Sequence, residues 1–239
     1  MMYNHLLVVV TASMLALLAS GTATASIIQV DFQPSGGVTQ SGFTAITNNL
    51  TTTIGGVTFK VSGEFFTRNP GFTDSGAFTY EGLFDDFAYT NGTGTTAPAI
   101  TLQMSGLLQN TAYALRFYSG DMFPAATYPV NAPWAGILTT TYSPIVGTGS
   151  TLSSTFDRTA NPTTNDQYSA LGTITSNASG QITMSIVGSS TSGYAFTRLN
   201  GLVLESQKGV IPEPATVIVW SLLATCALAF GWYRKRRAA

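Results

Sequence analysis

The sequence has very little of two residues that most enzyme and metal sites need. Its 239 residues include one Cys and one His. These are Cys226 and His5, which lie near opposite ends of the chain. Residues 26–208 therefore contain neither, and this interior can build no Ser-His-Asp triad, no Cys nucleophile, no zinc site of the usual nitrogen and sulfur type, and no disulfide.

Charge is also scarce. Charged residues make up 9% of the chain and hydrophobic residues 44%. Residues 26–208 hold ten acidic and six basic side chains, a net charge of about −4. Such a surface has no basic stripe for a phosphate backbone, so no nucleic-acid binding is expected. The apolar content indicates a folded body, and about 185 residues suit one domain with a sizeable core.

The N-terminus is typical of a secreted protein. An apolar run over residues 6–19 is followed by small residues and by Ala23-Thr24-Ala25 before Ser26. This pattern predicts a signal peptide over residues 1–25, removed by signal peptidase after Ala25. The first five residues lack Lys and Arg, which departs from the usual pattern, and an uncleaved membrane anchor is the alternative. Either way, the body is expected to be exported.

The C-terminus combines three unlike segments. Pro212-Glu213-Pro214 is followed by residues 215–233, which carry no charge, and then by Arg234, Lys235, Arg236 and Arg237. At about 1.5 Å per residue, a helix over 215–233 spans the ~30 Å core of a bilayer, and the basic cluster favours the cytoplasmic side. The alternative is a buried core helix. We expect a single transmembrane helix that holds the protein at the inner membrane in transit.

This order of segments resembles the PEP-CTERM sorting signal of Gram-negative and related bacteria, which is also catalogued as the C-terminal domain of ice-binding proteins. The resemblance covers residues 209–239. It implies that an exosortase, a membrane-embedded processing enzyme, recognises Pro212, Glu213 and Pro214 and delivers the protein to the cell surface or extracellular matrix. The domain order is then a signal peptide at 1–25, an exported domain at 26–208 and a sorting segment at 209–239.

The exported domain has the pattern of a sheet protein. Apolar and polar residues alternate with period two around Leu102, Leu115 and Met184, as expected of strands with one face on a core. Further strands are expected at residues 27–32, 57–61, 84–89, 137–142, 168–174 and 194–205, the last of them broken at Asn200-Gly201. Short strands with frequent turns predict an all-β fold, an antiparallel β-sandwich of jelly-roll type.

Two stretches are similar to known sandwiches. Residues 107–121, LLQNTAYALRFYSGD, resemble the tyrosine corner of fibronectin type III domains, in which a core Tyr caps a turn with its hydroxyl. RLNGLVLE at 198–205 and IIQVDFQP at 27–34 resemble the paired last and first strands of galactose-binding-like and malectin-like jelly rolls. The second resemblance implies carbohydrate binding.

Candidate ligand-binding residues are rings in loop-like stretches and one nearby acid: Tyr80, Phe123, Tyr128, Trp134 and Asp121. Aromatic rings stack on sugar faces, and carboxylates hold hydroxyls. The alternative for Trp134 is a ring that covers one end of the core.

No cofactor is expected, apart from a possible calcium ion held by Asp31 and Glu205 at the ends of the terminal strands. The alternative is that these are isolated solvated carboxylates. Asp85 and Asp86 are adjacent, so at strand spacing they are expected to point to opposite faces.

The leading hypothesis is a non-enzymatic surface or matrix protein. A lectin-like module that binds extracellular polysaccharide is the alternative, and a secreted glycoside hydrolase is the second alternative.

Overall fold

The computed structural model describes residues 27–206, apart from 48–50, 68–72, 93, 122–135, 159 and 192. The expected signal peptide and its cleavage residues Ala23, Ala25 and Ser26 lie outside this part of the chain, as do Pro212, Glu213, Pro214, the 215–233 span and the basic tail. The regular elements of the described residues are strands, apart from one five-residue helix, α2 (Glu81–Asp85). The all-β prediction is confirmed for them. No helix found there is long and apolar enough to cross a bilayer.

The first six-stranded sheet contains both ends of the described chain. Its order is β10 (Thr148–Gly149), β12 (Ser169–Thr175), β8 (Ala112–Tyr118), β15 (Gly201–Ser206), β1 (Ile27–Gln33) and β2 (Thr44–Thr47). β1 pairs antiparallel with β15, so the expected pairing of first and last strands is confirmed. β1 and β2 are parallel, which the antiparallel prediction did not include.

The second six-stranded sheet is antiparallel throughout. Its order is β11 (Leu152–Asp157), β9 (Ile137–Val146), β13 (Gln181–Ser190), β7 (Ile100–Ser105), β4 (Val57–Val61) and β3 (Thr52–Ile54). In β7, Leu102 and Met104 are buried while Gln103 between them is exposed. The period-two alternation therefore gave the correct inward face.

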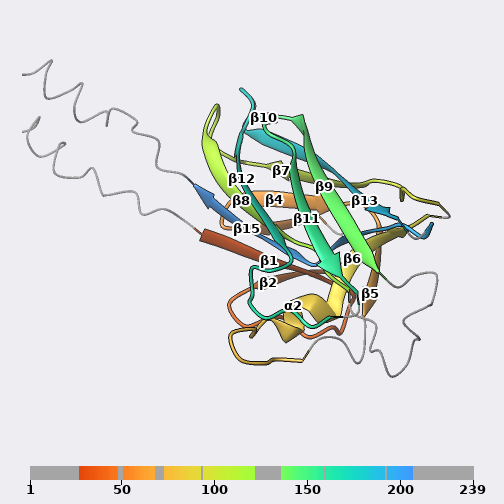
Figure 1. Cartoon of the computed structure of the whole chain (residues 1–239). Coiled ribbons are helices and arrows are strands. Elements are labelled where there is room, and N and C mark those ends of the chain that lie inside the picture. The colour runs from red at the N-terminus through yellow and green to blue at the C-terminus, as the bar shows by residue number, and fades with distance from the viewer. Residues whose placement is uncertain are drawn as a thin grey trace, which may run out of the picture. The chain divides into compact units, whose positions relative to one another are not determined.

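The main core lies between these two sheets (Figure 1). The rings of Phe117 on β8 and Tyr142 on β9 stack across it, with centroids 4.6 Å apart. Burial of each large apolar side chain contributes roughly 1.5–3 kcal/mol. This core makes the sandwich a rigid support for the groups at its ends.

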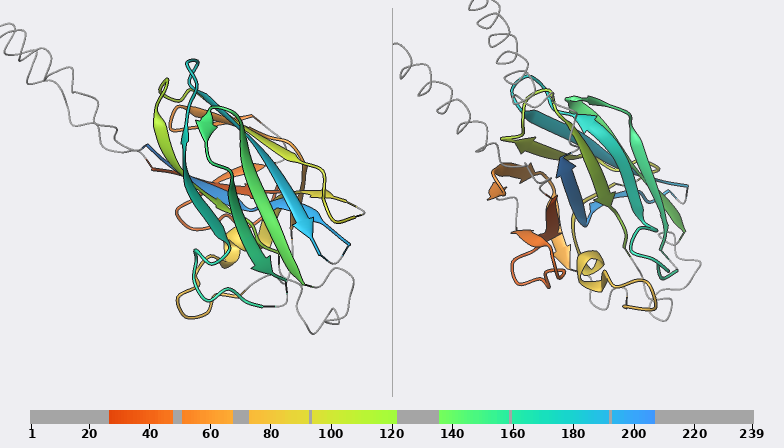
Figure 2. Two further views of the ribbon diagram at one scale, coloured as in Figure 1. Left: turned by 45° about the horizontal axis from the view of Figure 1, so that its top comes forward. Right: turned by 90° about the vertical axis from the view of Figure 1, so that its left-hand side faces the viewer.

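A third, three-stranded sheet and α2 lie at one end of the sandwich (Figures 1 and 2). The sheet consists of β14 (Phe196–Leu199), β6 (Asp86–Asn91) and β5 (Glu64–Thr67), all antiparallel. The prediction of a strand over 84–89 is wrong for its first residues, which belong to α2. Neighbouring Leu83 and Phe84 are both buried, which a helix permits and a two-sided strand with one solvent face does not.

Two local predictions are confirmed. The buried Tyr113 accepts a hydrogen bond on its hydroxyl from the Leu108 amide at 2.8 Å, as in a tyrosine corner. The 194–205 segment breaks at Asn200, between β14 and β15. Because the two strands join different sheets, this break carries the chain from the third sheet to the first.

Candidate ligand-binding site

The sequence-predicted ligand residues do not form one site among the described residues. Trp134, Tyr128 and Phe123 lie outside the part of the chain that the structure describes. Tyr80 is half-buried and belongs to an aromatic cluster, with its ring edge-on to Phe43 at 5.5 Å and to Tyr118 at 5.7 Å between centroids. These contacts place Tyr80 as part of the packing around α2.

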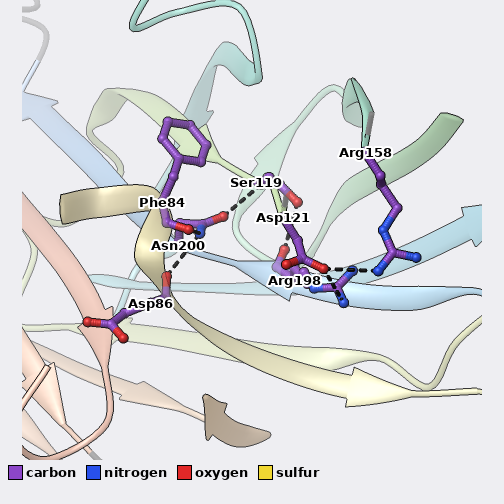
Figure 3. Close-up of polar contacts among 8 residues, drawn as sticks. Phe84, Asp86, Ser119, Asp121, Arg158, Arg198 and Asn200 are labelled. Atoms are coloured by element: carbon purple, nitrogen blue, oxygen red, sulfur yellow. Dashed lines mark hydrogen bonds and ion pairs between the residues drawn. The ribbon is translucent and has the colours of Figure 1, made fainter. Parts of the chain in front are cut away.

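Asp121 is a buried ion-pair residue and not a surface ligand. Its Oδ2 atom lies 3.0 Å from Nη2 of Arg158 and 2.6 Å from Nη2 of Arg198, and all three side chains are at most 3% exposed (Figure 3). Both guanidinium groups also lie over the Phe196 ring, at 4.9 and 4.6 Å from its centroid. Asp121 is buried because it pairs with Arg158 and Arg198, which lie far from it in the sequence but next to it in the fold.

The Asn200 side chain connects the backbone next to Asp121 with the start of β6. Its side-chain oxygen accepts a hydrogen bond from the Gly120 amide at 2.7 Å, and its Nδ2 donates to the Asp86 carbonyl at 2.9 Å (Figure 3). A longer bond of 3.4 Å reaches the Phe84 carbonyl. The side-chain amide of Asn200 thus joins α2 and β6 to the segment that follows β8.

The structure does not bring Asp31 and Glu205 together. On the paired strands, Asp31 lies opposite Gly201 and Glu205 lies opposite Ile27, four residues away. At about 3.3 Å per residue this separates their backbones by roughly 13 Å. Asp31 is fully buried and Glu205 is exposed, so the two cannot share a calcium ion in this arrangement.

A hollow at the edge of the third sheet gathers the groups that fit a polar ligand. It has a volume of about 280 Å³ and is lined by Gly63, Glu64, Tyr89, Thr90, Asn91 and Pro98. Glu64 lies directly opposite Tyr89 in the β5–β6 register, and the Tyr89 hydroxyl donates to Glu64 Oε2 at 2.9 Å. This bond positions both a ring and a carboxylate on the hollow's wall.

Rings beside the hollow support Tyr89. Phe66, two residues after Glu64 on β5, is 41% exposed and packs edge-on against Tyr89 at 5.7 Å. It stacks on the buried Phe87 at 5.8 Å. Sequence reasoning missed Glu64, Tyr89 and Asn91 because they come together only when β5 pairs with β6.

A second group of polar side chains lies near α2. Burial is the main cause that raises the pKa of Asp31 to about 8, and the neighbouring carboxylates of Asp86 and Asp85 add to it. Burial also raises the pKa of Asp86, partly offset by the Thr67 hydroxyl and the Val38 amide. The pKa of Asp85 rises to about 7 because of burial and then the charges of Glu81, Asp86 and Asp74. The side chains of Asp85 and Asp86 were expected on opposite faces of one strand. Instead, a helix ends at Asp85 and a strand begins at Asp86.

No protein-family model and no curated protein matches the sequence. The solved structures with distant similarity include the following three. TmCBM61 in complex with β-1,4-galactotriose is 12% identical, with 61% of this chain and 86% of that chain covered and a TM-score of 0.31. The exo-β-1,3-galactanase from Phanerochaete chrysosporium is 17% identical over 60% of this chain and 29% of its own, with a TM-score of 0.26. A carbohydrate-binding module of the β-sandwich superfamily is 11% identical over 64% and 56%, with a TM-score of 0.20.

Proposed function

We propose that the β-sandwich is a non-enzymatic carbohydrate-binding module of an exported bacterial surface or extracellular-matrix protein. The observation that carries the proposal is the hollow at the edge of the third sheet, whose lining includes Tyr89, Glu64 and Asn91. A ring with adjacent polar groups is the combination that recognises a sugar, because one face of a sugar ring is apolar and its rim carries hydroxyls.

Each group has a distinct role in this site. Tyr89 supplies a ring for the apolar face of a sugar. Glu64 accepts hydrogen bonds from sugar hydroxyls, and Asn91, exposed at the end of β6, both donates and accepts. About 280 Å³ lies just below the range for ligand sites, ~300–1,000 Å³, which favours one sugar ring of a longer extracellular polysaccharide.

The terminal segments complete the proposal. Signal peptidase removes residues 1–25, and an exosortase recognises Pro212, Glu213 and Pro214 before the protein reaches the surface or matrix. This part is supported by the order of triplet, apolar span and basic tail and by its resemblance to PEP-CTERM signals. Pro212 and Pro214 oppose helix formation and favour an extended segment, which a processing enzyme can bind.

A secreted glycoside hydrolase is the alternative, and the hollow favours binding over hydrolysis. Glycoside hydrolysis uses two carboxylates about 5–10 Å apart across the scissile bond. Among the described residues, Glu64 is the one acid that lines this hollow, and it already accepts a hydrogen bond from the Tyr89 hydroxyl. Release of reducing sugar from a bound glycan would favour the hydrolase.

The test is a glycan array on the full chain, followed by calorimetric titration of each hit. We expect Tyr89→Ala and Glu64→Gln to weaken binding roughly tenfold or more, equivalent to about 1.4 kcal/mol. Glu205→Gln, at an exposed acid of the first sheet, is the matched control and should bind as the unmodified chain does.

Tyr89→Phe separates the ring from its hydroxyl. It should retain most of the affinity lost in Tyr89→Ala if the ring stacks on the sugar. Binding that survives both Tyr89→Ala and Glu64→Gln would place the sugar elsewhere, and an empty array across polysaccharide classes would refute the module.

A further inference from the structure

One exposed carboxylate beside the hollow has no basic partner in the described structure. Glu64 is the first residue of β5 and is exposed. Its Oε2 atom accepts the hydrogen bond from the Tyr89 hydroxyl. The acids in the ion pairs between described residues are Asp121 and Asp166. A ligand that reaches Glu64 therefore meets a negative charge that no cation of the described residues contacts.

The close approach of β5 to β6 fixes this carboxylate beside an aromatic ring. Gly63, directly before β5, has a φ of 117°, and a Cβ there would lie 3.1 Å from the Tyr89 carbonyl oxygen. A larger residue would be strained and crowded at this position. β5 can therefore begin directly opposite Tyr89, with Glu64 as its register partner. The 2.9 Å bond between the two side chains keeps the carboxylate at the hydroxyl end of the ring.

Two more rings hold the Tyr89 ring in place. Phe66 lies opposite Phe87 in the β5–β6 register, so both share a face of the third sheet with Glu64 and Tyr89. The Tyr89 ring is edge-on to both, with centroids 5.7 Å from Phe66 and 6.0 Å from Phe87. Because the ring and the carboxylate are positioned in advance, a ligand loses less binding energy to ordering them.

A ring with a carboxylate at its edge is a combination that binds an ammonium or guanidinium group. The carboxylate accepts charge-assisted hydrogen bonds, and the ring attracts a cation that lies within about 6 Å of its centroid. The protein uses this combination internally. The Arg198 guanidinium lies 4.6 Å from the Phe196 centroid, and its Nη2 lies 2.6 Å from Asp121 Oδ2. Glu64 and Tyr89 offer the same two contacts at the surface.

The charge of the site decides which sugars fit it. Uncharged residues complete the lining of the hollow, namely Gly63, Thr90, Asn91 and Pro98. A uronic acid or a sulfated sugar would place a second negative charge next to Glu64. Residues 26–208 also carry a net charge of about −4, from ten acidic and six basic side chains, which attracts polycations and repels polyanions at longer range.

We propose that Glu64 and Tyr89 bind the protonated amino group of an amino sugar, so that the ligand of the hollow is a polysaccharide with free amino groups. This inference rests on the proposed function, because it names the class of sugar that the same site takes. The ammonium group donates to Glu64 and lies against the Tyr89 ring, while Asn91, exposed at the end of β6, bonds neighbouring hydroxyls. N-acetylation of the sugar removes the contact, because it turns the amine into a neutral amide.

The experiment is calorimetric titration of the full chain with β-1,4-linked tetramers of glucosamine, N-acetylglucosamine, glucose and galacturonic acid. It is carried out at about pH 6, where the amino group carries its proton. We expect the glucosamine tetramer to bind roughly tenfold tighter than the two neutral tetramers, and the acidic tetramer to bind most weakly. The preference should shrink between about 50 mM and about 500 mM salt, because salt screens exposed charges.

Glu64→Gln tests the charge alone, because it keeps the size of the side chain and an acceptor for the Tyr89 hydroxyl. It should weaken binding of the glucosamine tetramer more than that of the neutral tetramers, so that the preference falls to about twofold or less. Tyr89→Ala should weaken binding of every tetramer. Glu205→Gln, which removes an exposed acid on β15, is the matched control and should keep the full preference.

Two results would refute the amino-sugar inference and leave the binding module standing. One is equal affinity for the glucosamine and neutral tetramers, with binding still lost in Tyr89→Ala. The other is a preference that survives Glu64→Gln, or tetralysine that binds as tightly as the glucosamine tetramer, since either would show a general attraction of cations. If no glycan of any charge class binds, the proposed function itself is overturned.

Discussion

Asp121 holds one negative charge between two guanidinium groups in a place that water does not reach. Both Arg158 and Arg198 are almost fully buried and lie over the Phe196 ring. A buried ion pair is weak evidence for stability by itself, but loss of one partner leaves a charge without compensation. Here the loss of Asp121 removes an ion-pair partner from two buried guanidinium groups at once.

Asp121→Asn should lower the free energy of unfolding by about 3–5 kcal/mol, measured by urea unfolding followed by fluorescence. Asp166→Asn is the matched control, because Asp166 pairs with Arg116 at 2.8 Å on the surface with 60% of its side chain exposed. An exposed pair contributes at most about 1 kcal/mol. Equal losses in the two variants would contradict the role assigned to Asp121.

Asn200 connects β14 of the third sheet to β15 of the first sheet. Its side chain is fully buried and bonds the Gly120 amide and the carbonyls of Asp86 and Phe84. Because its side chain bonds backbone groups of α2, β6 and the segment after β8 at once, it fixes where α2 and β6 meet the first sheet.

Asn200→Ala should lower the free energy of unfolding by about 2 kcal/mol or more, since it leaves buried backbone groups unpaired. Asn165→Ala is the comparison, because Asn165 also bonds a backbone amide, that of Thr79, but at an exposed position. We expect that loss to stay within about 1 kcal/mol, and hydrogen exchange should show new opening at α2 and β6 only in Asn200→Ala. If Asn200→Ala lowers the free energy of unfolding no more than Asn165→Ala does, the Asn200 side chain is not needed to hold α2 and β6 in place.

Elements with a local signal could be predicted from the sequence. The alternation around Leu102 and Met184, the Tyr113 corner and the break at Asn200 all appear in the structure. Each of these depends on residues that are close together in the chain.

Elements and sites that depend on distant pairing could not be predicted. α2 has only five residues, which is too short to show a helical period in the sequence. The acids near α2 lie 55 residues apart in the chain, at Asp31 and Asp86, and meet through the 34–42 loop. Asp31 was selected as a calcium ligand, but its expected partner Glu205 lies at the wrong end of β15.

At the scale of the whole molecule, the prediction concerns processing of the two ends. Intact mass of the protein from its native host, compared between membrane and surface or medium fractions, should show a mature form that starts at Ser26 and ends near Pro212–Pro214. Signal peptidase would cleave after Ala23-Thr24-Ala25, and the exosortase would recognise Pro212-Glu213-Pro214. A form ending at Ala239, found in the membrane fraction alone, would instead make the 215–233 span a permanent anchor and remove the exosortase from the account.

The pairing of β1 with β15 sets the order in which the molecule can be completed. A ribosome makes β1 first and β15 last, and Asp31 has no partner at Gly201 until nearly the whole domain has emerged. Contacts between such distant residues are slow to form because the intervening chain must first be closed into a loop. In a partly made chain, β1 keeps one hydrogen-bonding edge open, and open edges pair with other chains.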